Sequence, residues 1–224
     1  NLTVELNSTR TGVPVLWWRV VGSTHTAYAV ETFIDTLAHH AGQDPLAYRQ
    51  ALLTHDPRRL AVLNLAAEKA GWSTMLPKGK ARGIAVARAF GTYVAQVAEI
   101  SVAPDGKLKV DRVVCAVDCG IAVNPDIIAA QMEGGIGFGL GAILYSKITL
   151  KDGRVQQSNF DGYQVLRIDE MPSVEVHIVP SAEAPTGVGE PGVAPIGPAG
   201  ANAIFAATGK MPPILPLAPD GKVA

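Results

Sequence analysis

Cysteine is scarce in this chain, since only Cys115 and Cys119 occur among 224 residues. Two thiols cannot supply the four ligands of a structural zinc ion or an iron–sulfur cluster, and their spacing differs from the C-x-x-C of redox motifs. Both lie in the apolar stretch VVCAVDCG, which is typical of a strand, so they are expected on the same face. The sequence predicts two buried, free thiols.

Charge of either sign is also sparse. Charged residues make up 17% of the chain and the formal net charge is -1, with acids and bases spread along its length. Such a chain has no basic surface for nucleic acid, so nucleic-acid binding is excluded. It lacks an apolar run of about 18 residues, and its first ten residues do not match a signal peptide, so neither a membrane span nor a leader is expected. The hydrophobic share, 48%, is that of a packed globular protein.

Helices are predicted for the first third of the chain. Apolar residues recur at helical spacing between Val30 and Ala41, and Gly42 follows at a C′ position. The stretches DPLAYRQALL and DPRRLAVLNLAAEKAGW each begin with a capping Asp and a Pro at the first helical position. Four histidines lie near these helices without the spacing of a metal site, which favours packing or solvent-facing roles: His25, His39, His40 and His55.

Strands follow a connector that is expected over residues 75–83. The stretches YVAQVAEISV and LKVDRVVCAVD are separated by APDGK, which predicts a β-hairpin from about Tyr93 to Asp118. A second strand, Asp-Gly, strand pattern runs through residues 147–160, and residues 173–181 alternate as a further strand.

Two more helices complete the predicted α+β fold. Asn124 and Pro125 can begin one of them, and a short apolar helix over residues 200–208 is stopped by Gly209. We divide the chain into a helical segment, 1–76, and an α+β segment, 77–224. Five glycines in the helix after Pro125 cost helix propensity, so something must lie close against its backbone: Gly134, Gly135, Gly137, Gly139 and Gly141.

A lone carboxylate, Glu190, lies among glycines and prolines in TGVGEPGVAPIGP, just before the last predicted helix. Such a loop has a fixed and unusual shape, which suggests a site. Two interpretations are open. Glu190 could cap the helix, or it could act as a general base whose proton affinity is raised by partial desolvation.

The glycines of this loop match the dinucleotide fingerprint G-x-G-x-x-G at Gly187, Gly189 and Gly192. Pro195 and Pro198 fall where the phosphate-binding helix should run, which argues against a nicotinamide dehydrogenase. An anion at the mouth of the helix remains an alternative.

Gln131 and Glu133 occur in AAQMEGG and face different sides of their helix. Either residue could lie on a solvated face. Gln131, just before closely packed glycines, is also well placed to donate hydrogen bonds to a polar cofactor.

Five blocks resemble the C-terminal part of the molybdenum-binding subunits of the xanthine dehydrogenase/aldehyde oxidase family, most of all the isoquinoline 1-oxidoreductase beta-subunit type. They span nearly the whole chain in order: VLWWRVVGSTHTAYAVETFIDTLA, FGTYVAQVAEISV, VDCGIAVNPDIIAAQMEGGIGFGLGA, SNFDGYQVLRIDEMP and GVGEPGVAPIGPAGANAIFAATGK.

The resemblance implies a molybdenum hydroxylase that acts on aldehydes or N-heteroaromatic compounds. Glu190 would be the base toward a molybdenum-bound hydroxyl, and Gln131 a contact to the pterin. Arg19, in the block WWRVVG, would lie close to the cofactor and substrate. The glycines of both blocks would make room for the cofactor, a molybdopterin cytosine dinucleotide: Gly134, Gly135, Gly187 and Gly189.

Two glycine-rich cofactor segments of the family, G-G-G-F-G and G-x-E-M-G-Q-G, do not occur in this sequence. The resemblance therefore implies that another chain carries the remaining part of the molybdenum-binding polypeptide. A separate subunit would hold 2Fe-2S clusters, with a cytochrome c or flavin subunit as acceptor. The resemblance also implies a bacterial protein that is located in the periplasm or is attached to the membrane through its partners, with the cytoplasm as the alternative location. A non-catalytic structural subunit of such a complex is the alternative function.

Overall fold

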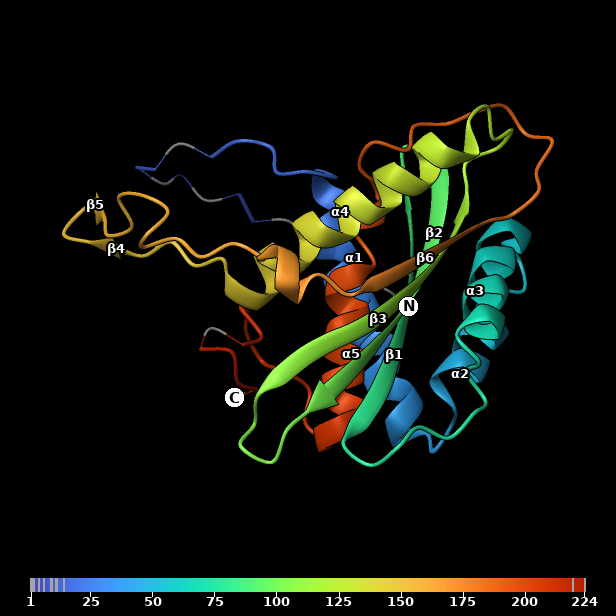
Figure 1. The fold of residues 1–224 in the computed structure, drawn as a ribbon. Helices are drawn as coiled ribbons and strands as arrows, with labels where there is room; N and C mark the ends of the chain where they lie inside the picture. The colour runs from blue at the N-terminus through green and yellow to red at the C-terminus, as the bar shows by residue number, and fades with distance from the viewer. Residues whose placement is uncertain are drawn as a thin grey trace.

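A four-stranded sheet forms the centre of the computed structural model, which describes residues 15–218 and 220–223, together with residues 3, 5, 7, 8, 10, 12 and 13. The strand order is β1-β2-β3-β6. Strands β1 (Lys80–Ala89), β2 (Thr92–Val102) and β3 (Leu108–Asp118) are antiparallel, whereas β6 (Ser173–Ile178) runs parallel to β3 (Figure 1). The predicted hairpin between residues 93 and 118 is confirmed as β2–β3.

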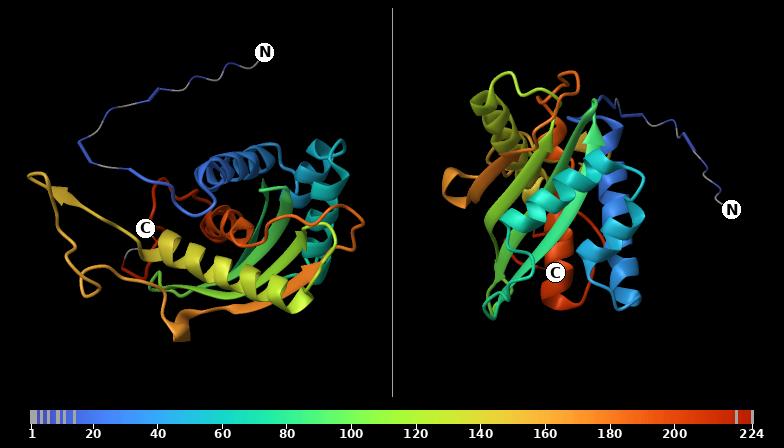
Figure 2. Two further views of the ribbon diagram at one scale, coloured as in Figure 1. Left: turned by 90° about the horizontal axis from the view of Figure 1, so that it is seen from above. Right: turned by 90° about the vertical axis from the view of Figure 1, so that its right-hand side faces the viewer.

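The three predicted helices of the first third are confirmed as α1 (Gly22–His40), α2 (Pro45–Leu52) and α3 (Pro57–Lys69). The side chains of Asp44 and Asp56 accept hydrogen bonds from the first backbone N–H groups of α2 and α3. Helix α3 packs on one face of the sheet. Residues of α3, within the predicted helical segment, therefore share a hydrophobic core with β1, β2 and β3, and Figure 2 shows α3 lying against the sheet.

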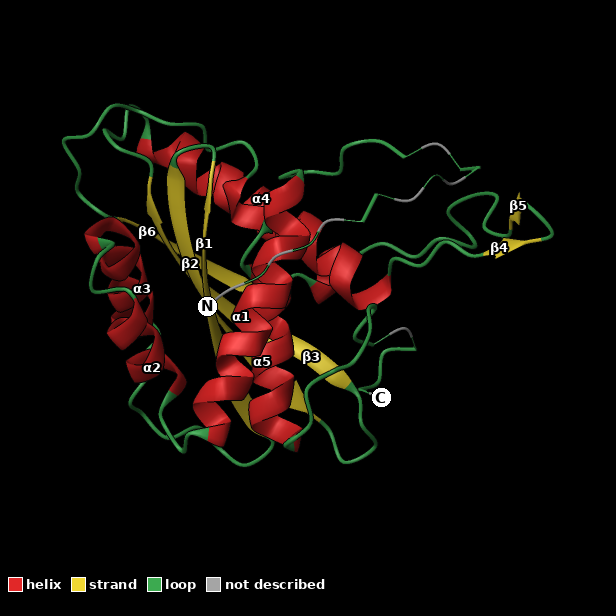
Figure 3. Ribbon diagram, turned by 180° about the vertical axis from the view of Figure 1, so that it is seen from behind, coloured by secondary structure: helices red, strands yellow, loops and turns green. Residues whose placement is uncertain are grey.

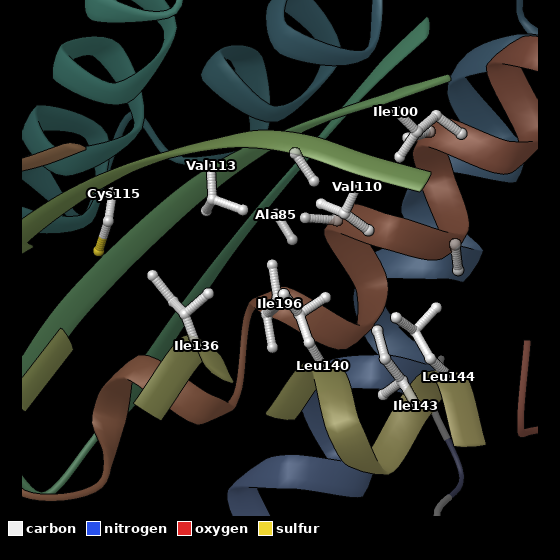
Figure 4. Close-up of a cluster of buried hydrophobic side chains, with 14 of the residues drawn as sticks. Ala85, Ile100, Val110, Val113, Cys115, Ile136, Leu140, Ile143, Leu144 and Ile196 are labelled. Carbon is white, nitrogen blue, oxygen red and sulfur yellow. The ribbon is translucent and has the colours of Figure 1, made fainter. Parts of the chain in front are cut away.

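The other face of the sheet is covered by α4 (Pro125–Tyr145) and α5 (Ile196–Thr208), and α1 lies beside α5 (Figure 3). Side chains of β1, β2 and β3 meet those of α4 and α5 in the main core, including Ala85, Val113, Ile136, Leu140 and Ile196 (Figure 4). The α+β fold class is therefore confirmed.

Helix α4 is long and apolar enough to cross a membrane, but half of its most apolar window is buried within the protein. Its residues Met132, Ile136 and Leu140 are fully buried in the main core. The length and composition of α4 are accordingly those of a core helix of this fold.

Two boundaries predicted from the sequence were wrong. Strand β1 begins at Lys80, inside the predicted connector 75–83. Helix α5 begins at Ile196, four residues before the predicted start, and contains Pro198 in its first turn. Proline is tolerated there because the N–H groups of the first turn have no partner within the helix.

The structure argues against a dinucleotide site on a ground other than the positions of Pro195 and Pro198. In a dinucleotide site the glycines follow directly on a strand, whereas residues 179–186 separate β6 from Gly187.

The second Asp-Gly hairpin is confirmed but short, with β4 (Leu150–Lys151) and β5 (Arg154–Val155) at the end of an arm that projects from the body (Figure 1).

Both cysteines are free and buried in the same hydrophobic cluster, as expected. Burial raises the pKa of the Cys115 thiol to about 12. Because the thiolate is the reactive form and Cys115 is fully buried, we expect this thiol to be unreactive at neutral pH.

Close packing explains several glycines of α4. A Cβ atom on Gly139 would clash with Ile196 of α5, and one on Gly135 would lie 3.2 Å from the Cα atom of Gly192. The prediction that something lies close against this backbone is confirmed at Gly135 and Gly139, where the neighbour is the chain itself, but not at Gly134, where no atom lies within 4 Å of an added Cβ atom.

We expect Gly139→Ala to lower the free energy of unfolding by about 1–3 kcal/mol, because the added methyl group overpacks the contact with Ile196. Urea unfolding of the isolated chain measures this. Gly134→Ala on the same helix is the matched control: no atom lies within 4 Å of the added Cβ atom, so about 1 kcal/mol of stabilisation is expected from helix propensity. Equal effects of the two changes would contradict the packing argument.

Candidate cofactor site

The carboxylate of Glu190 is anchored to the segment that contains Arg19. Its Oε1 atom accepts a hydrogen bond from the backbone N–H of Val20, at an N–O distance of 2.9 Å. Within the part of the chain that the structure describes, this is the one hydrogen bond of the half-buried Glu190 side chain. The other carboxylate oxygen can therefore still accept a proton or a hydrogen bond.

Val20 occupies a strained turn just before α1. The N–H of Val21 donates to the carbonyl of Trp18 at 2.8 Å, and Val20 has a φ of 71°. A β-branched residue in this region costs roughly 1–3 kcal/mol and persists only where its surroundings enforce it. Here they do, because the buried Val20 side chain packs against Ala87, Val193 and other small residues. The strain is thus stored next to the one carboxylate of the glycine-rich loop.

The glycine-rich loop is also tied to the sheet. The hydroxyl of Thr92, at the start of β2, donates to the carbonyl of Gly187 at 2.7 Å and lies 2.6 Å from the hydroxyl of Thr186. The N–H of Thr186 donates to the carbonyl of Cys119. The loop that carries Glu190 is therefore fixed by contacts to β2, to the residue after β3 and to the turn before α1.

The end of β3 is itself fixed by an ion pair between Asp118 and Arg58 of α3. Two hydrogen bonds of 2.7 Å join the guanidinium to the two carboxylate oxygens. They hold the pKa of Asp118 below its usual range. The Arg58 guanidinium also lies over the ring of Tyr93.

A lowered carboxyl pKa contributes stability above the pKa of the unfolded chain, and this contribution is lost as the pH falls through the folded pKa. We therefore expect Asp118→Asn to destabilise the chain at pH 7, with a smaller difference from the wild type toward pH 3. Thermal unfolding at a series of pH values measures this difference. A difference that grows as the pH falls would contradict the assignment.

Helix α4 contacts the glycine-rich loop through Gly135 on its buried face and carries an exposed stripe on another face. Gln131, Gly134 and Phe138 share a face of the helix because they are spaced by three and four residues. Gln131 and Gly134 are exposed, and the Gln131 side chain has no hydrogen-bond partner among the described residues. No atom lies within 4 Å of a Cβ atom placed on Gly134.

The aromatic ring of Phe138 joins this stripe to the Arg19 segment. The Arg19 guanidinium lies 4.3 Å from the centre of the Phe138 ring, and the Trp18 ring lies 4.9 Å from it. Cation–π and tilted aromatic contacts of this kind stabilise the approach of the two segments. The structure thus brings Arg19, Glu190 and the exposed face of α4 together, although they are far apart in the sequence.

The four glycines predicted at the site fall into two groups. Gly134, Gly187 and Gly189 are exposed, and the space beside Gly134 and Gly189 is open. Gly135 is buried against Gly192, so the space that it leaves is filled by this chain rather than left free for a ligand.

The capping interpretation of Glu190 was wrong. Glu190 precedes the short helix η2 (Pro191–Val193), but its side chain makes no capping hydrogen bond there, and α5 likewise has no side-chain cap. The side chain points to Val20 instead. Glu133, the other acid considered, is exposed on α4.

A cavity of 460 Å³ lies beside the same turn, within the range of about 300–1,000 Å³ that is usual for small-molecule sites. It is lined mainly by apolar side chains, among them Trp18, Val21 and Ile143. Tyr28 also lines it, and the buried Tyr28 hydroxyl has no hydrogen-bond partner among the described residues. Burial raises the pKa of Tyr28, so this hydroxyl remains a hydrogen-bond donor at neutral pH.

The described residues contain no group of three or more His, Cys, Asp or Glu side chains that could hold a metal ion. Any metal at this site would have to be held by other groups. What the chain does offer is an amide at Gln131, open glycines and one carboxylate, which fits contacts to a polar organic cofactor.

Residues 34–172, more than half of the chain, match the model of the molybdopterin cofactor-binding domain. The chain belongs to this family. Gln131 and Gly134 lie inside the matched region of this molybdopterin-binding chain, whereas Arg19 and Glu190 lie outside it. The resemblance to molybdenum-binding subunits that the sequence suggested is confirmed.

Several curated proteins are similar to the molybdopterin-binding chain. It is 36% identical to the beta subunit of isoquinoline 1-oxidoreductase from Brevundimonas diminuta, over 96% of its own length and 28% of that protein. It is 34% identical to the membrane-bound aldehyde dehydrogenase of Gluconacetobacter polyoxogenes, over 86% of its length and 28% of that protein. The chain thus spans less than a third of the length of these relatives.

Solved structures share its fold. Quinoline 2-oxidoreductase from Pseudomonas putida 86 superposes with a TM-score of 0.77 over 91% of this chain and 52% of the other, at 12% identity. Aldehyde oxidoreductase from Desulfovibrio gigas gives a TM-score of 0.67 over 86% of this chain and 39% of the other, at 14% identity. At such identities these similarities establish the fold alone.

Three contributors to the site were not found from the sequence: Val20, Phe138 and Trp18. The contact of Val20 with Glu190 spans 170 positions, and no local pattern signals it. The paired tryptophans before Arg19 were a visible signal, because exposed aromatics next to a charged residue are common at binding sites.

Proposed function

We propose that this chain forms one wall of the active site of a molybdenum hydroxylase, which oxidises aldehydes or hydroxylates N-heteroaromatic compounds. The observation that carries the proposal is the hydrogen bond from the Val20 N–H to the Glu190 carboxylate. This bond keeps the lone acid of a rigid loop beside Arg19 and the exposed face of α4. The names of the relatives, which include an isoquinoline oxidoreductase and an aldehyde dehydrogenase, support the choice of substrates.

In this proposal the molybdenum cofactor, when bound, supplies the oxidation–reduction chemistry. Gln131 donates and accepts hydrogen bonds at the pterin, and Gly134 and Gly189 leave room for it. Arg19 carries positive charge beside the substrate. Glu190 takes up a proton on its free oxygen, while the Val20 N–H holds the other oxygen so that the side chain does not rotate away. Orientation of the base before the reaction is the contribution of this chain.

The finer assignments are also proposals. We infer the molybdopterin cytosine dinucleotide form of the cofactor. The partners are the remaining part of the molybdenum-binding polypeptide, an iron–sulfur subunit with 2Fe-2S clusters, and a cytochrome c or flavin subunit as acceptor. A bacterial periplasmic or membrane-associated complex fits these partners.

Elemental analysis of the native assembly tests the function as a whole. We expect about one molybdenum atom per copy of this chain, together with aldehyde- or heterocycle-dependent reduction of an artificial dye. An assembly of normal composition that contains no molybdenum would contradict the proposal.

Gly134→Ala tests the cofactor wall separately from the base. The added methyl group is expected to stabilise the isolated chain, as described above, yet to lower the molybdenum content of the assembly at least 3-fold, because it fills space reserved for the cofactor. Gly162→Ala, at an exposed position in the arm beyond β5 where the added Cβ atom meets no atom closer than 3.7 Å, is the control for assembly. A full molybdenum content in Gly134→Ala would show that the cofactor lies elsewhere.

A further inference from the structure

Helix α1 buries its charged residues and exposes large apolar ones, the reverse of the usual amphipathic helix. Apart from its histidines, the only charged residues in its 19 positions are Glu31 and Asp35, and both are buried, 5% and 2% exposed. Its large apolar residues Val30, Phe33 and Leu37 are 52%, 62% and 37% exposed. A solvent-facing helix normally shows the opposite arrangement, with charge outside and apolar residues inside.

The buried polar face of α1 is committed to contacts within the chain. Arg49 of α2 donates hydrogen bonds of 2.8 Å to the carboxylates of Glu31 and Asp35. Glu31 also accepts from the N–H of Val86 on β1, the edge strand of the sheet. The helix cannot rotate to bury its apolar face without leaving these charges unpaired, which would be strongly unfavourable.

The exposed face therefore has a composition found in interface cores rather than on free surfaces. Between Gly22 and His40 it carries no Lys, Arg, Asp or Glu side chain, and depletion of charge together with an exposed aromatic residue marks the core of an interface. Val30, Phe33 and Leu37 are spaced by three and four residues, so they form one continuous stripe. In Figures 2 and 3 this helix lies on the outside of the molecule, with α5 beside it.

The greater length of the relatives supplies an occupant of suitable chemistry for the stripe. The chain spans 28% of the beta subunit of isoquinoline 1-oxidoreductase, and its fold occupies 52% of the solved quinoline 2-oxidoreductase chain. A substantial part of the molybdenum-binding polypeptide thus lies outside these residues. An uncharged stripe fits an apolar surface of that polypeptide, and does not fit an acidic or basic partner.

We propose that the stripe of Val30, Phe33 and Leu37 is the docking surface for a companion polypeptide that carries the remaining part of the molybdenum-binding polypeptide chain. The inference rests on the proposed function for the identity of the partner. In the assembly, α1 becomes an internal layer, with its polar face on Arg49 and its apolar face on the companion.

The experiment uses the native assembly, purified through a tag on this chain, with the companion identified by mass spectrometry from its molybdopterin-binding sequence. Phe33→Asp is compared with Ile168→Asp, a matched change at a residue that is 96% exposed on another element, η1 (Ile168–Glu170). We expect Phe33→Asp to recover at least 10-fold less companion per chain, and Ile168→Asp to recover the wild-type amount. Val30→Lys is the second variant on the stripe and is expected to behave like Phe33→Asp.

Thermal unfolding of the isolated variants separates lost docking from lost folding. Because Phe33 is mostly exposed, the Tm of Phe33→Asp should stay within a few degrees of the wild type. Full recovery of the companion by both stripe variants would overturn the inference and leave the proposed function standing. The inference would also be overturned if Ile168→Asp lost as much companion as the stripe variants. It would likewise be overturned if this chain formed a dimer that Phe33→Asp dissociates while the companion stays bound. A failure of the proposed function would appear differently, as an intact assembly without molybdenum.

Discussion

We expect Glu190→Gln to lower kcat of the assembled enzyme by about 10²–10⁴-fold, the usual contribution of a general base. The amide keeps the size of the side chain, and its oxygen can still accept the hydrogen bond from the Val20 N–H. It cannot take up a proton. Steady-state kinetics with a saturating aldehyde or N-heteroaromatic substrate, together with the molybdenum content of the same sample, measure the effect.

Glu183→Gln is the matched control, since Glu183 is an exposed acid in the segment between β6 and the glycine-rich loop. It should leave kcat and the molybdenum content unchanged. If Glu190→Gln retained full turnover with a normal molybdenum content, Glu190 would not be the base. If molybdenum were lost along with activity, Glu190 would act in cofactor binding instead.

The second large effect is expected at the buried ion cluster that orients α1. Arg49 is 1% exposed and donates to Glu31, Asp35 and two backbone carbonyls. Arg49→Met should lower the free energy of unfolding by about 3–5 kcal/mol, because two carboxylates would remain buried without their cation. Urea unfolding at pH 7 measures this loss, and Arg154→Met, at an exposed position on β5, should change stability by less than about 0.5 kcal/mol.

The pH dependence gives this prediction a second readout. Burial raises the pKa of Asp35 even with Arg49 beside it, and loss of Arg49 should raise it further. A raised carboxyl pKa stabilises the protein at low pH, and this contribution is lost as the pH rises through the folded pKa. The deficit of Arg49→Met should therefore shrink as the pH is lowered from 7 toward 4. A deficit that does not depend on pH would contradict this account of the cluster.

Local chemistry made most elements of this fold predictable. Asp-Pro and Asn-Pro pairs predicted the starts of α2, α3 and α4, and Asp-Gly pairs predicted both hairpins, because caps and tight turns depend on neighbouring residues only. The start of α5 was missed since a proline in the first turn looks the same in sequence as one that ends a helix.

The site was predictable only in part, because it is built from distant segments. Glu190, Gln131 and Arg19 could be named from the blocks that contain them. Their juxtaposition depends on Val20, whose strained backbone has no sequence signal, and on packing of Gly135 against Gly192. The orientation of α1 could not be predicted either. Its apolar residues have helical spacing, but ion pairs with Arg49 of α2 determine which face of α1 is buried.

The central claim is that Glu190 faces the molybdenum centre, and a crystal structure of the assembly with anomalous diffraction data at the molybdenum absorption edge tests it most directly. The account predicts a single anomalous peak per copy of this chain, next to the free carboxylate oxygen of Glu190 and beside Gly134. A peak on the far side of the sheet, with the Glu190 side chain in bulk solvent, would contradict it.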